Sequence, residues 1–314
     1  MTKDNNSYVL VLGASIIDIL GFCQNKYRPC DSIPGNIKIS FGGVCRNIAE
    51  NLARVGINTK FISAIGKDKN GDDILEHSKK IGYDMEHSLI LENSSTPTYM
   101  AVLDEEGEMQ SAVVDMESIN KIDANFIDSK ADIIRNSEYT ILDSDNVELL
   151  EYILKKCNGQ TKFILDPISS VKAERVKHLV PYFHTIKPNR LEAEALCGYK
   201  IKTLDDVKKA GKYLLDQGVE NVFISLDCDG VYYCNKETSG IVKSEQVKVK
   251  NVTGAGDSFV SGIAYGYMNG LSMEETVRYA IAMSVITIRH EETINPNMSE
   301  ELALKVKDEL KWFS

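Results

Sequence analysis

The amino-acid sequence predicts an α/β fold with a mostly parallel central sheet. From about residue 120 onward, short apolar runs alternate with longer segments whose apolar residues recur at helical spacing. This alternation is typical of parallel strands joined by crossover helices, which cover both faces of the sheet. With 314 residues, of which 43% are hydrophobic, the chain can bury such a core. A ligand is then expected at the carboxyl ends of the strands.

The expected elements follow from apolar periodicity and from the glycines that end helices. The segment 44–55 has its apolar residues on one face and is followed by Gly56, and 72–81 is followed by Gly82, so both are expected helices. Further helices are expected over 146–156, 190–197, 205–217, 258–268, 273–289 and 299–312. Strands are expected over 8–12, 36–41, 60–65, 139–142, 162–165, 185–187 and 221–226, with edge strands over 230–235 and 240–249.

Two segments of the N-terminal part, about 15–42 and 96–116, carry strand and turn signals without helices between them. The second segment contains a hairpin, 98–104 and 108–114, that turns through Glu105-Glu106-Gly107. We expect both segments to form a small sheet that stands off the main body as a lid. Because no repeat or Pro-rich linker divides the chain, a single domain over residues 1–314 is expected.

Composition narrows the class of partner. The net charge of −10 argues against nucleic acid or an anionic membrane surface as the main partner. No uncharged run approaches the ~20 residues of a membrane span. The seven cysteines have scattered spacings, which favours reduced thiols, and the N-terminus lacks the pattern of a signal peptide. We therefore expect a cytoplasmic protein whose partners are small molecules.

The run Thr253-Gly254-Ala255-Gly256-Asp257 is the strongest functional signal. Its small residues let the backbone approach a ligand, and the helix that follows points free N–H groups at an anion. An aspartate at this place can act as general base for an attacking hydroxyl. The alternative is a glycine turn before a buried helix.

Three other constellations are compatible with the same chemistry. Gly42-Gly43 ends a strand, and Asn47 lies one helical turn later, where its amide can bind vicinal hydroxyls or cap the helix. Asp18, after the first strand, can grip sugar hydroxyls or belong to a turn. Asn189 and Glu192 share a face at a helix start, where they suit either a phosphate–Mg²⁺ network or a capping pair.

In this order the four signals resemble the ribokinase-like (PfkB) carbohydrate kinase family over essentially the whole chain. Gly42-Gly43 with Asn47 is similar to its N-terminal signature, Thr253–Asp257 to its C-terminal signature, and Lys187–Glu192 to its Asn-x-x-Glu metal motif. The resemblance implies a three-layer sandwich with a small β-sheet lid, and ATP and Mg²⁺ as cofactors. It also implies a possible homodimer through the lid, where exposed strand edges gain from being covered.

The resemblance further implies roles for particular residues. Asp257 takes the proton of the acceptor hydroxyl, and Gly254, Ala255 and Gly256 form the anion hole. Residues implied to bind the acceptor are Asp18, Ser32, Gly42, Gly43, Arg46, Asn47, Thr98 and Tyr99. Residues implied to bind the nucleotide are Asn189, Ser225, Gly230, Thr253, Gly254, Gly256 and Asn295, with Glu192 organising Mg²⁺ through water. Asn251 replaces an aspartate that helps to bind a monovalent cation in many members, which puts that cation in doubt.

A narrower resemblance concerns the subgroup that phosphorylates pseudouridine. It rests on Asp31–Gly35 before the lid strand and on Cys45-Arg46, where many members carry a small residue and alanine. Arg46 adds fixed donors suited to a polar base or a phosphate. The implied reaction is ATP-dependent phosphorylation of the 5′-hydroxyl of a ribonucleoside. Two alternatives stay open: a kinase for ribose, a ketohexose or a common nucleoside, and a non-catalytic ligand sensor on the same fold.

Overall fold

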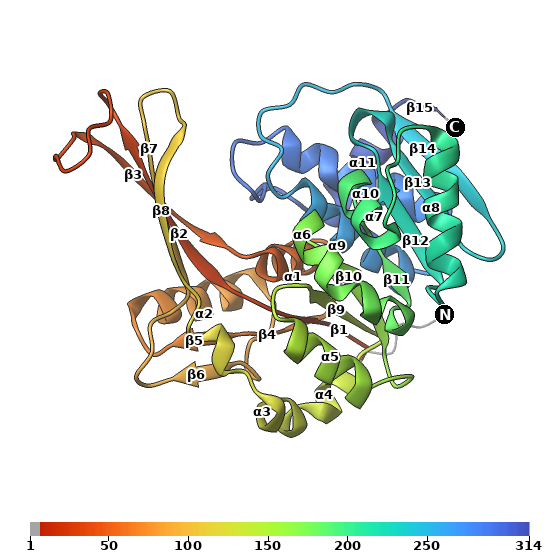
Figure 1. Ribbon diagram of the computed structural model, residues 1–314, viewed down its shortest axis with the longest axis horizontal. Coiled ribbons are helices and arrows are strands. Elements are labelled where there is room, and N and C mark those ends of the chain that lie inside the picture. Colours follow the sequence, from red (N-terminus) through yellow and green to blue (C-terminus); the bar gives the residue numbers. More distant parts are fainter. Residues whose placement is uncertain (1–6, 314) are drawn as a thin grey trace.

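The computed structural model describes residues 7–313, and its centre is a nine-stranded sheet (Figure 1). In spatial order the strands are β15 (Trp312–Phe313), β14 (Ser239–Ser244), β13 (Val231–Cys234), β12 (Asn221–Ser225), β11 (Thr185–Ile186), β10 (Lys162–Asp166), β9 (Tyr139–Asp143), β1 (Val9–Leu12) and β4 (Thr59–Ile62). The six strands from β12 to β4 are parallel, and β13, β14 and β15 are antiparallel additions. The predicted mostly parallel sheet is confirmed.

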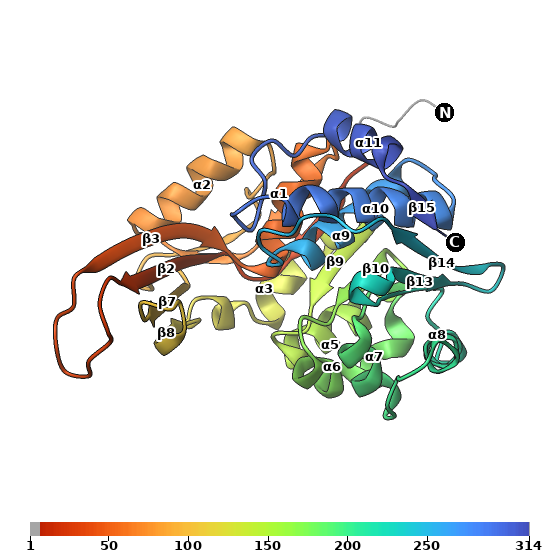
Figure 2. The ribbon, with the colours of Figure 1, turned by 90° about the horizontal axis from the view of Figure 1, so that it is seen from above.

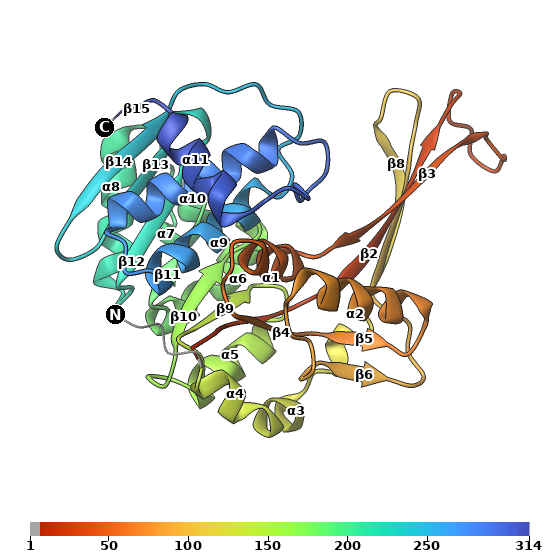
Figure 3. The same cartoon turned by 180° about the vertical axis from the view of Figure 1, so that it is seen from behind.

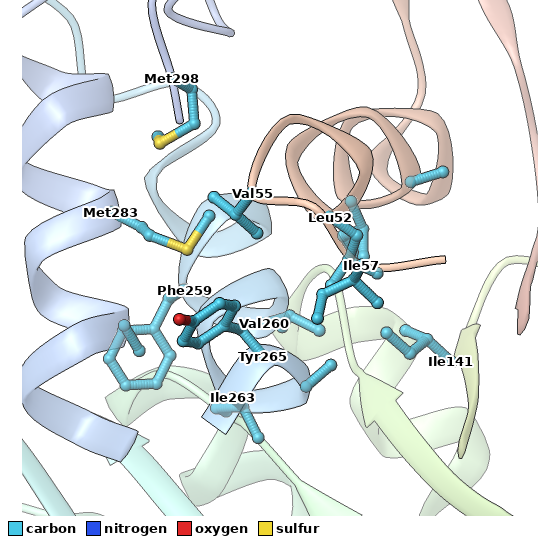
Figure 4. Close-up of a cluster of buried hydrophobic side chains, with 14 of the residues drawn as sticks. Leu52, Val55, Ile57, Ile141, Phe259, Val260, Ile263, Tyr265, Met283 and Met298 are labelled. Carbon is cyan, nitrogen blue, oxygen red and sulfur yellow. The ribbon is translucent and has the colours of Figure 1, made fainter. Parts of the chain in front are cut away.

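Helices cover both faces of this sheet, as Figure 2 shows from above. Strand β1 illustrates the two cores, because Val9 and Val11 point into one cluster and Leu10 and Leu12 into the other. The first core, part of which is drawn in Figure 4, packs against α1 (Val44–Arg54), α2 (Lys69–Ile81), α9 (Ala255–Met268), α10 (Met273–Ile288) and α11 (Glu300–Glu309). The second packs against α3 (Ala124–Ser129), α4 (Ala131–Arg135), α5 (Val147–Lys156), α6 (Ser170–Val176), α7 (Arg190–Cys197) and α8 (Leu204–Asp216). The predicted three-layer α/β sandwich is therefore confirmed.

A four-stranded sheet projects from the main body (Figures 1 and 3). Its strands, in spatial order, are β3 (Gly35–Gly42), β2 (Ile16–Cys23), β7 (Thr98–Leu103) and β8 (Met109–Asp115). The register pairs Ile16 with Gly42 near the main body and Cys23 with Gly35 at the free end. These strands fall within the two segments predicted for the lid. A closing role for this small sheet stays a prediction.

The structure corrects several predicted element bounds. The strand expected over 60–65 is two strands, β4 and β5 (Ala64–Gly66), and β5 pairs instead with β6 (Leu89–Leu91). The break falls at Ser63. Its backbone N–H donates to Oγ of Ser88 at 3.1 Å and not to a neighbouring strand of the large sheet. The helix expected over 299–312 ends at Glu309, because Trp312 belongs to β15 and pairs with Ser244 of β14. Neither β13 nor β14 is an edge strand, because β15 lies outside β14, and β14 ends at Ser244.

Two further expectations bear on the class of protein. All seven cysteines are free thiols, as their scattered spacing predicts. Among residues 7–313, no helix has the length and apolar character needed to cross a bilayer.

Candidate active site

The N-termini of α1 and α9 each begin at a glycine with positive φ. Gly43, before α1, has φ 99°, and Gly254, before α9, has φ 82°. A β-carbon on Gly43 would lie 2.4 Å from the carbonyl oxygen of Ala14, and one on Gly254 would lie 2.2 Å from that of Thr293. Both turns therefore require glycine for conformation and for space. Neither glycine provides a side-chain cap for its helix.

The two glycine motifs meet through Asn47 and Asp257. Asn47 lies one turn into α1, Asp257 lies in the first turn of α9, and both side chains are buried. The Nδ2 group of Asn47 donates a hydrogen bond of 2.6 Å to Oδ2 of Asp257. A second bond, from the hydroxyl of Ser261 to the carbonyl oxygen of Ile48, joins the same two helices at 3.2 Å. Residues far apart in the sequence thus form one site.

The surroundings of Asp257 tune its carboxyl group for work near neutral pH. Burial, and then the negative charge of Asp166, raise its pKa to about 7. The hydrogen bond from Asn47 and the positive charges of Lys187 and Arg46 act in the opposite direction. A carboxyl group with a pKa close to the working pH is well matched to general base catalysis.

The first turn of α9 offers backbone donors beside this carboxyl group. The first N–H groups of a helix have no partner within the helix, and here no side chain caps them. The N–H of Ala255 is used by the carbonyl oxygen of Val252, which leaves those of Gly256 and Asp257. Two donors at the positive end of the helix dipole suit an anion such as a phosphoryl group.

The turn before α9 is ordered by Asn251. Its Oδ1 accepts from the backbone N–H of Thr253 at 2.9 Å, and its Nδ2 donates to the carbonyl oxygen of Glu291 at 3.0 Å. The side chain of Thr253 is exposed. Asn251 thus has a structural role in this turn. That its presence weakens or abolishes a monovalent-cation site stays a prediction.

Lys187 and Asp166 belong to the site although sequence reasoning did not assign them. Asp166 ends β10 and Lys187 directly follows β11, so both lie at the carboxyl edge of the sheet. Lys187 is buried, and its Nζ lies 3.3 Å from Oδ2 of Asp166 and 3.0 Å from the place of a β-carbon on Gly256. Burial disfavours its charged form, but the carboxylates of Asp166, Glu192 and Asp257 raise the pKa of Lys187. A lysine between a short strand and Pro188 was visible in the sequence, but its burial was not.

Asn189 and Glu192 form a capping box at the start of α7. The backbone N–H of Glu192 donates to Oδ1 of Asn189 at 2.9 Å, and that of Asn189 donates to Oε2 of Glu192 at 2.8 Å. The capping alternative is therefore present in the structure. Glu192 is also buried within the electrostatic reach of Lys187, so capping and a role toward a cation are compatible. Ser225 is the bridge partner of Asn189, which brings these two predicted nucleotide residues together.

Asp18, Gly42 and Tyr99 lie together on the small sheet. A β-carbon on Gly42 would lie 2.1 Å from a carboxylate oxygen of Asp18, and Asp18 is the register partner of Tyr99. Because neighbouring strand residues point to opposite faces, Thr98 faces away from Asp18 and Tyr99. Tyr99 therefore shares the face of Asp18, whereas Thr98 does not, and the acceptor-binding roles of Thr98 and Tyr99 stay predictions.

Three other predicted residues lie apart from this cluster or have structural contacts. Ser32 is exposed in the loop between β2 and β3, at the free end of the small sheet (Figure 1). Gly230 has φ 95°, and a β-carbon there would lie 2.3 Å from the carbonyl oxygen of Val242, so the packing of β14 requires this glycine. Asn295 holds its loop to the end of α10 by donating to the carbonyl oxygen of Ile286 at 3.1 Å. Their binding roles stay predictions.

A cavity of about 180 Å³ lies beyond the ends of β1 and β9. Its wall includes Gly13 and Ala14 from the turn behind Gly43, and the carboxyl group of Asp143. Burial, and then the charge of Asp145, raise the pKa of Asp143 to about 6, and the thiol of Cys45 donates to it at 3.2 Å. The cavity thus places a titratable carboxyl group next to the glycine turn of α1.

A buried carboxyl group beside free backbone N–H groups, near the carboxyl edge of a parallel sheet, is an arrangement expected of a phosphotransferase. The chain belongs to the pfkB family of carbohydrate kinases, whose family model matches residues 6–300. The resemblance noted from the motifs is thereby confirmed. Members of this family generally use ATP with Mg²⁺.

Individual relatives and structures agree with this membership. The chain is 35% identical to pseudouridine kinase from Escherichia coli over 93% of this chain and 94% of the relative. It is 27% identical to guanosine-inosine kinase from Exiguobacterium acetylicum over 94% and 99%. A crystal structure of a candidate sugar kinase from Clostridium perfringens shares 55% identity and a TM-score of 0.94, over 98% of both chains. Arabidopsis thaliana ribokinase, at 22% identity, shares the fold with a TM-score of 0.84 over 98% and 99%.

Proposed function

We propose that this protein phosphorylates the 5′-hydroxyl of a ribonucleoside with ATP, and that pseudouridine is its preferred acceptor. The observation that carries the proposal is the hydrogen bond between Asn47 and Asp257. It joins the helix start suited to hydroxyls with the helix start suited to a phosphoryl group. An acceptor hydroxyl placed between them is within reach of both the base and the anion site.

In the proposed reaction each group of the site has one task. Asp257 takes the proton of the 5′-hydroxyl, and the freed oxygen attacks the γ-phosphorus of ATP while the bond to ADP breaks. The N–H groups of Gly256 and Asp257, with the ammonium group of Lys187, stabilise the negative charge on the transferred group. Asp18, Gly43 and Asn47 hold the ribose hydroxyls. Because phosphoryl transfer depends mainly on positioning and charge, these groups are sufficient when the metal-bound nucleotide is present.

The residues present fit a divalent cation. Three buried carboxyl groups, those of Asp166, Glu192 and Asp257, surround the single ammonium group of Lys187, so the site carries excess negative charge. Carboxylate oxygens are the ligands that Mg²⁺ prefers. Glu192, through water, and Asp166 are the residues that would hold the ion, which neutralises the phosphates of ATP when bound. The nucleotide would lie toward Asn189, Ser225, Gly230, Thr253 and Asn295.

The preference for pseudouridine is supported by the similarity of the chain to pseudouridine kinase from Escherichia coli. The identity of 35% to pseudouridine kinase exceeds the 27% to guanosine-inosine kinase, at similar coverage of this chain. Ribose and the common nucleosides are the rival acceptors. The test is a panel of pseudouridine, uridine, guanosine, inosine, adenosine, ribose and fructose with ATP and Mg²⁺, read as ADP release. The highest kcat/KM for pseudouridine is expected. A higher value for ribose would overturn the preference, and no turnover on any acceptor would overturn the function.

We also propose a homodimer formed through the small sheet. Ile39, Ile19, Met100 and Val113 are direct register partners across its four strands and therefore share one face. Ile39, Met100 and Val113 are 66%, 49% and 68% exposed. An exposed apolar row of this kind is typical of an interaction surface, and a second copy of the sheet would cover it.

A further inference from the structure

The guanidinium group of Arg46 is bound within the protein. Its side chain is buried, with only 2% of the residue exposed. Nε donates to the carbonyl oxygen of Gly42 at 3.2 Å, and Nη2 donates to that of Phe41 at 2.8 Å. Nη2 also donates to Oδ1 of Asn47, and Nη1 donates to the carboxylate of Glu50. Arg46 therefore makes four hydrogen bonds within the protein, whereas the sequence predicts that it contacts a polar base or a phosphate of the substrate.

The bond from Arg46 decides which way the amide of Asn47 points. An asparagine amide has an oxygen that accepts and a nitrogen that donates. When Oδ1 faces the guanidinium group, Nδ2 is directed at Asp257, to which it donates at 2.6 Å. The flipped amide would place N–H groups against N–H groups on one side and oxygen against a carboxylate on the other. Arg46 therefore stabilises the one orientation in which Asn47 can donate to Asp257.

Glu50 anchors Arg46 from the opposite side. Its carboxylate is buried and also accepts from Nε of Arg54 and from Nε2 of His77, each at 2.8 Å. Burial alone would raise the pKa of Glu50, but the bonds and charges of His77, Arg46 and Arg54 hold it at about 2. Glu50 is thus ionised at every working pH and compensates the buried positive charge of Arg46.

We propose that Arg46, held by Glu50, is a positioning residue for catalysis. It fixes the end of β3 at Phe41 and Gly42, and it orients Asn47 so that Asn47 in turn orients the catalytic carboxylate of Asp257. The proposal rests on the proposed function, because it takes Asp257 as the base. Arg46 then affects every acceptor alike, since it acts on the base and not on a part of one substrate.

The arrangement connects Arg46 to the protonation of Asp257. The groups that act on this carboxyl group are Asp166 from the end of β10, Lys187 from the end of β11, and Asn47 and Arg46 from α1. Asp166 favours the protonated form, and the other three favour the carboxylate. Loss of Arg46 removes one positive charge and releases the amide of Asn47. The pKa of Asp257 then rises, and the base is protonated over a wider range of pH.

The test compares Arg46→Met with Arg54→Gln, an arginine of the same helix that also pairs with Glu50 but makes no bond to Asn47. Rates are measured from pH 5.5 to 9 with ATP and Mg²⁺, on the best nucleoside of the panel and on ribose. For Arg46→Met we expect kcat to fall about a hundredfold on both acceptors. We also expect the acid limb of kcat/KM to move up by at least half a pH unit. Arg54→Gln should remain within about threefold of the parent with an unmoved limb.

Several outcomes would overturn the proposal. A loss of activity on the nucleoside but not on ribose, with an unmoved acid limb, would indicate that Arg46 contacts the nucleobase of the substrate. If kcat falls equally in both variants and neither acid limb moves, the bonds of Arg46 and Arg54 to Glu50 contribute to stability only. If Arg46→Met does not fold, Arg46→Lys is combined with Asn47→Ala, and the lysine change should have little further effect in the alanine background. Full additivity of the two changes would contradict action through Asn47. Lack of turnover by the parent protein would instead refute the proposed function.

Discussion

Asn47 and Asp257 are separated by 210 residues in the sequence and by 2.6 Å in the structure. Each is buried in the first turns of a helix that starts at a glycine with positive φ. Their contact joins two separate glycine motifs into one buried cluster, the reaction centre of the proposed function.

The pH dependence of activity should follow Asp257. Its pKa is raised to about 7, and only the carboxylate accepts the proton of the acceptor, so kcat/KM should rise through about pH 7 and then level off. The measurement is the rate at low acceptor concentration between pH 5 and 9. An acid limb near pH 4 would show that Asp257 titrates as an ordinary exposed carboxyl group.

The same pKa predicts how stability changes with pH. The folded protein holds the proton of Asp257 more tightly than the unfolded chain, in which the pKa is near 3.8. Asp257 should therefore lower stability progressively as pH rises from about 4 to about 7. Asp257→Asn should unfold at a higher temperature than the parent at pH 8, and the gap should close near pH 4. A gap that does not depend on pH would contradict this sign.

Glu192→Gln separates the two roles of Glu192. Glutamine loses the negative charge and keeps only one of the two bonds that the carboxylate accepts from Asn189, because its NH2 group would face Nδ2 of Asn189, so the melting temperature should fall modestly. The Mg²⁺ concentration that gives half-maximal activity should rise about tenfold or more. Asp206→Asn is the control, because Asp206 closes the capping box of α8 with Thr203. Unchanged Mg²⁺ dependence in Glu192→Gln would leave Glu192 as a helix cap only.

Gly254→Ala tests the anion turn against a matched glycine. Gly254 and Gly56 have φ of 82° and 79°, so alanine strains both by about 1–2 kcal/mol. A β-carbon at Gly56 meets nothing within 4 Å, whereas one at Gly254 lies 2.2 Å from the carbonyl oxygen of Thr293. Gly56→Ala should lose stability in urea titration and keep its kcat. Gly254→Ala should also lose at least about tenfold in kcat, because the turn must shift. Equal kcat in the two variants would argue against the anion turn.

The proposed dimer should dissociate when charge is placed in its apolar row. Ile39→Lys combined with Val113→Lys should sediment as a monomer at concentrations where the parent is a dimer. Ala112→Lys is the control, because Ala112 lies on the same strand as Val113 and points to the opposite face. A parent protein that is monomeric at micromolar concentrations would contradict the proposal.

The three layers of the fold could be predicted from the sequence, because strand and helix periodicities alternate clearly from about residue 120 onward. Where it failed, long-range contacts decided the outcome. Ser63 ends β4 through a bond to Ser88, and Trp312 leaves the last helix to pair with Ser244. Neither partner is identifiable from local propensity. Interruptions of this kind need knowledge of the neighbouring strand.

Site residues could be predicted where a glycine motif dictates the backbone conformation. They were harder to predict where the position of a side chain depends on whether it is buried. Gly43, Gly254 and Asp257 lie where the motifs placed them. Lys187 was not assigned, because its burial between Asp166 and Gly256 arises from the ends of two strands. Arg46 was assigned to the substrate, but Glu50, one turn later on the same helix, holds it within the protein. Charged side chains can face either way from one backbone position, and the sequence alone does not decide between the two.

Whether Asp257 is the general base is tested most simply by the turnover of Asp257→Asn. The rate of ADP release is measured at pH 8 with saturating ATP, Mg²⁺ and the best acceptor of the panel, beside the parent protein. If Asp257 is the base, kcat should fall by about 10²–10⁴. The acceptor KM should change by less than about threefold, because asparagine can still accept the hydrogen bond of Asn47. A variant that turns over at the parent rate would show that Asp257 is not the base.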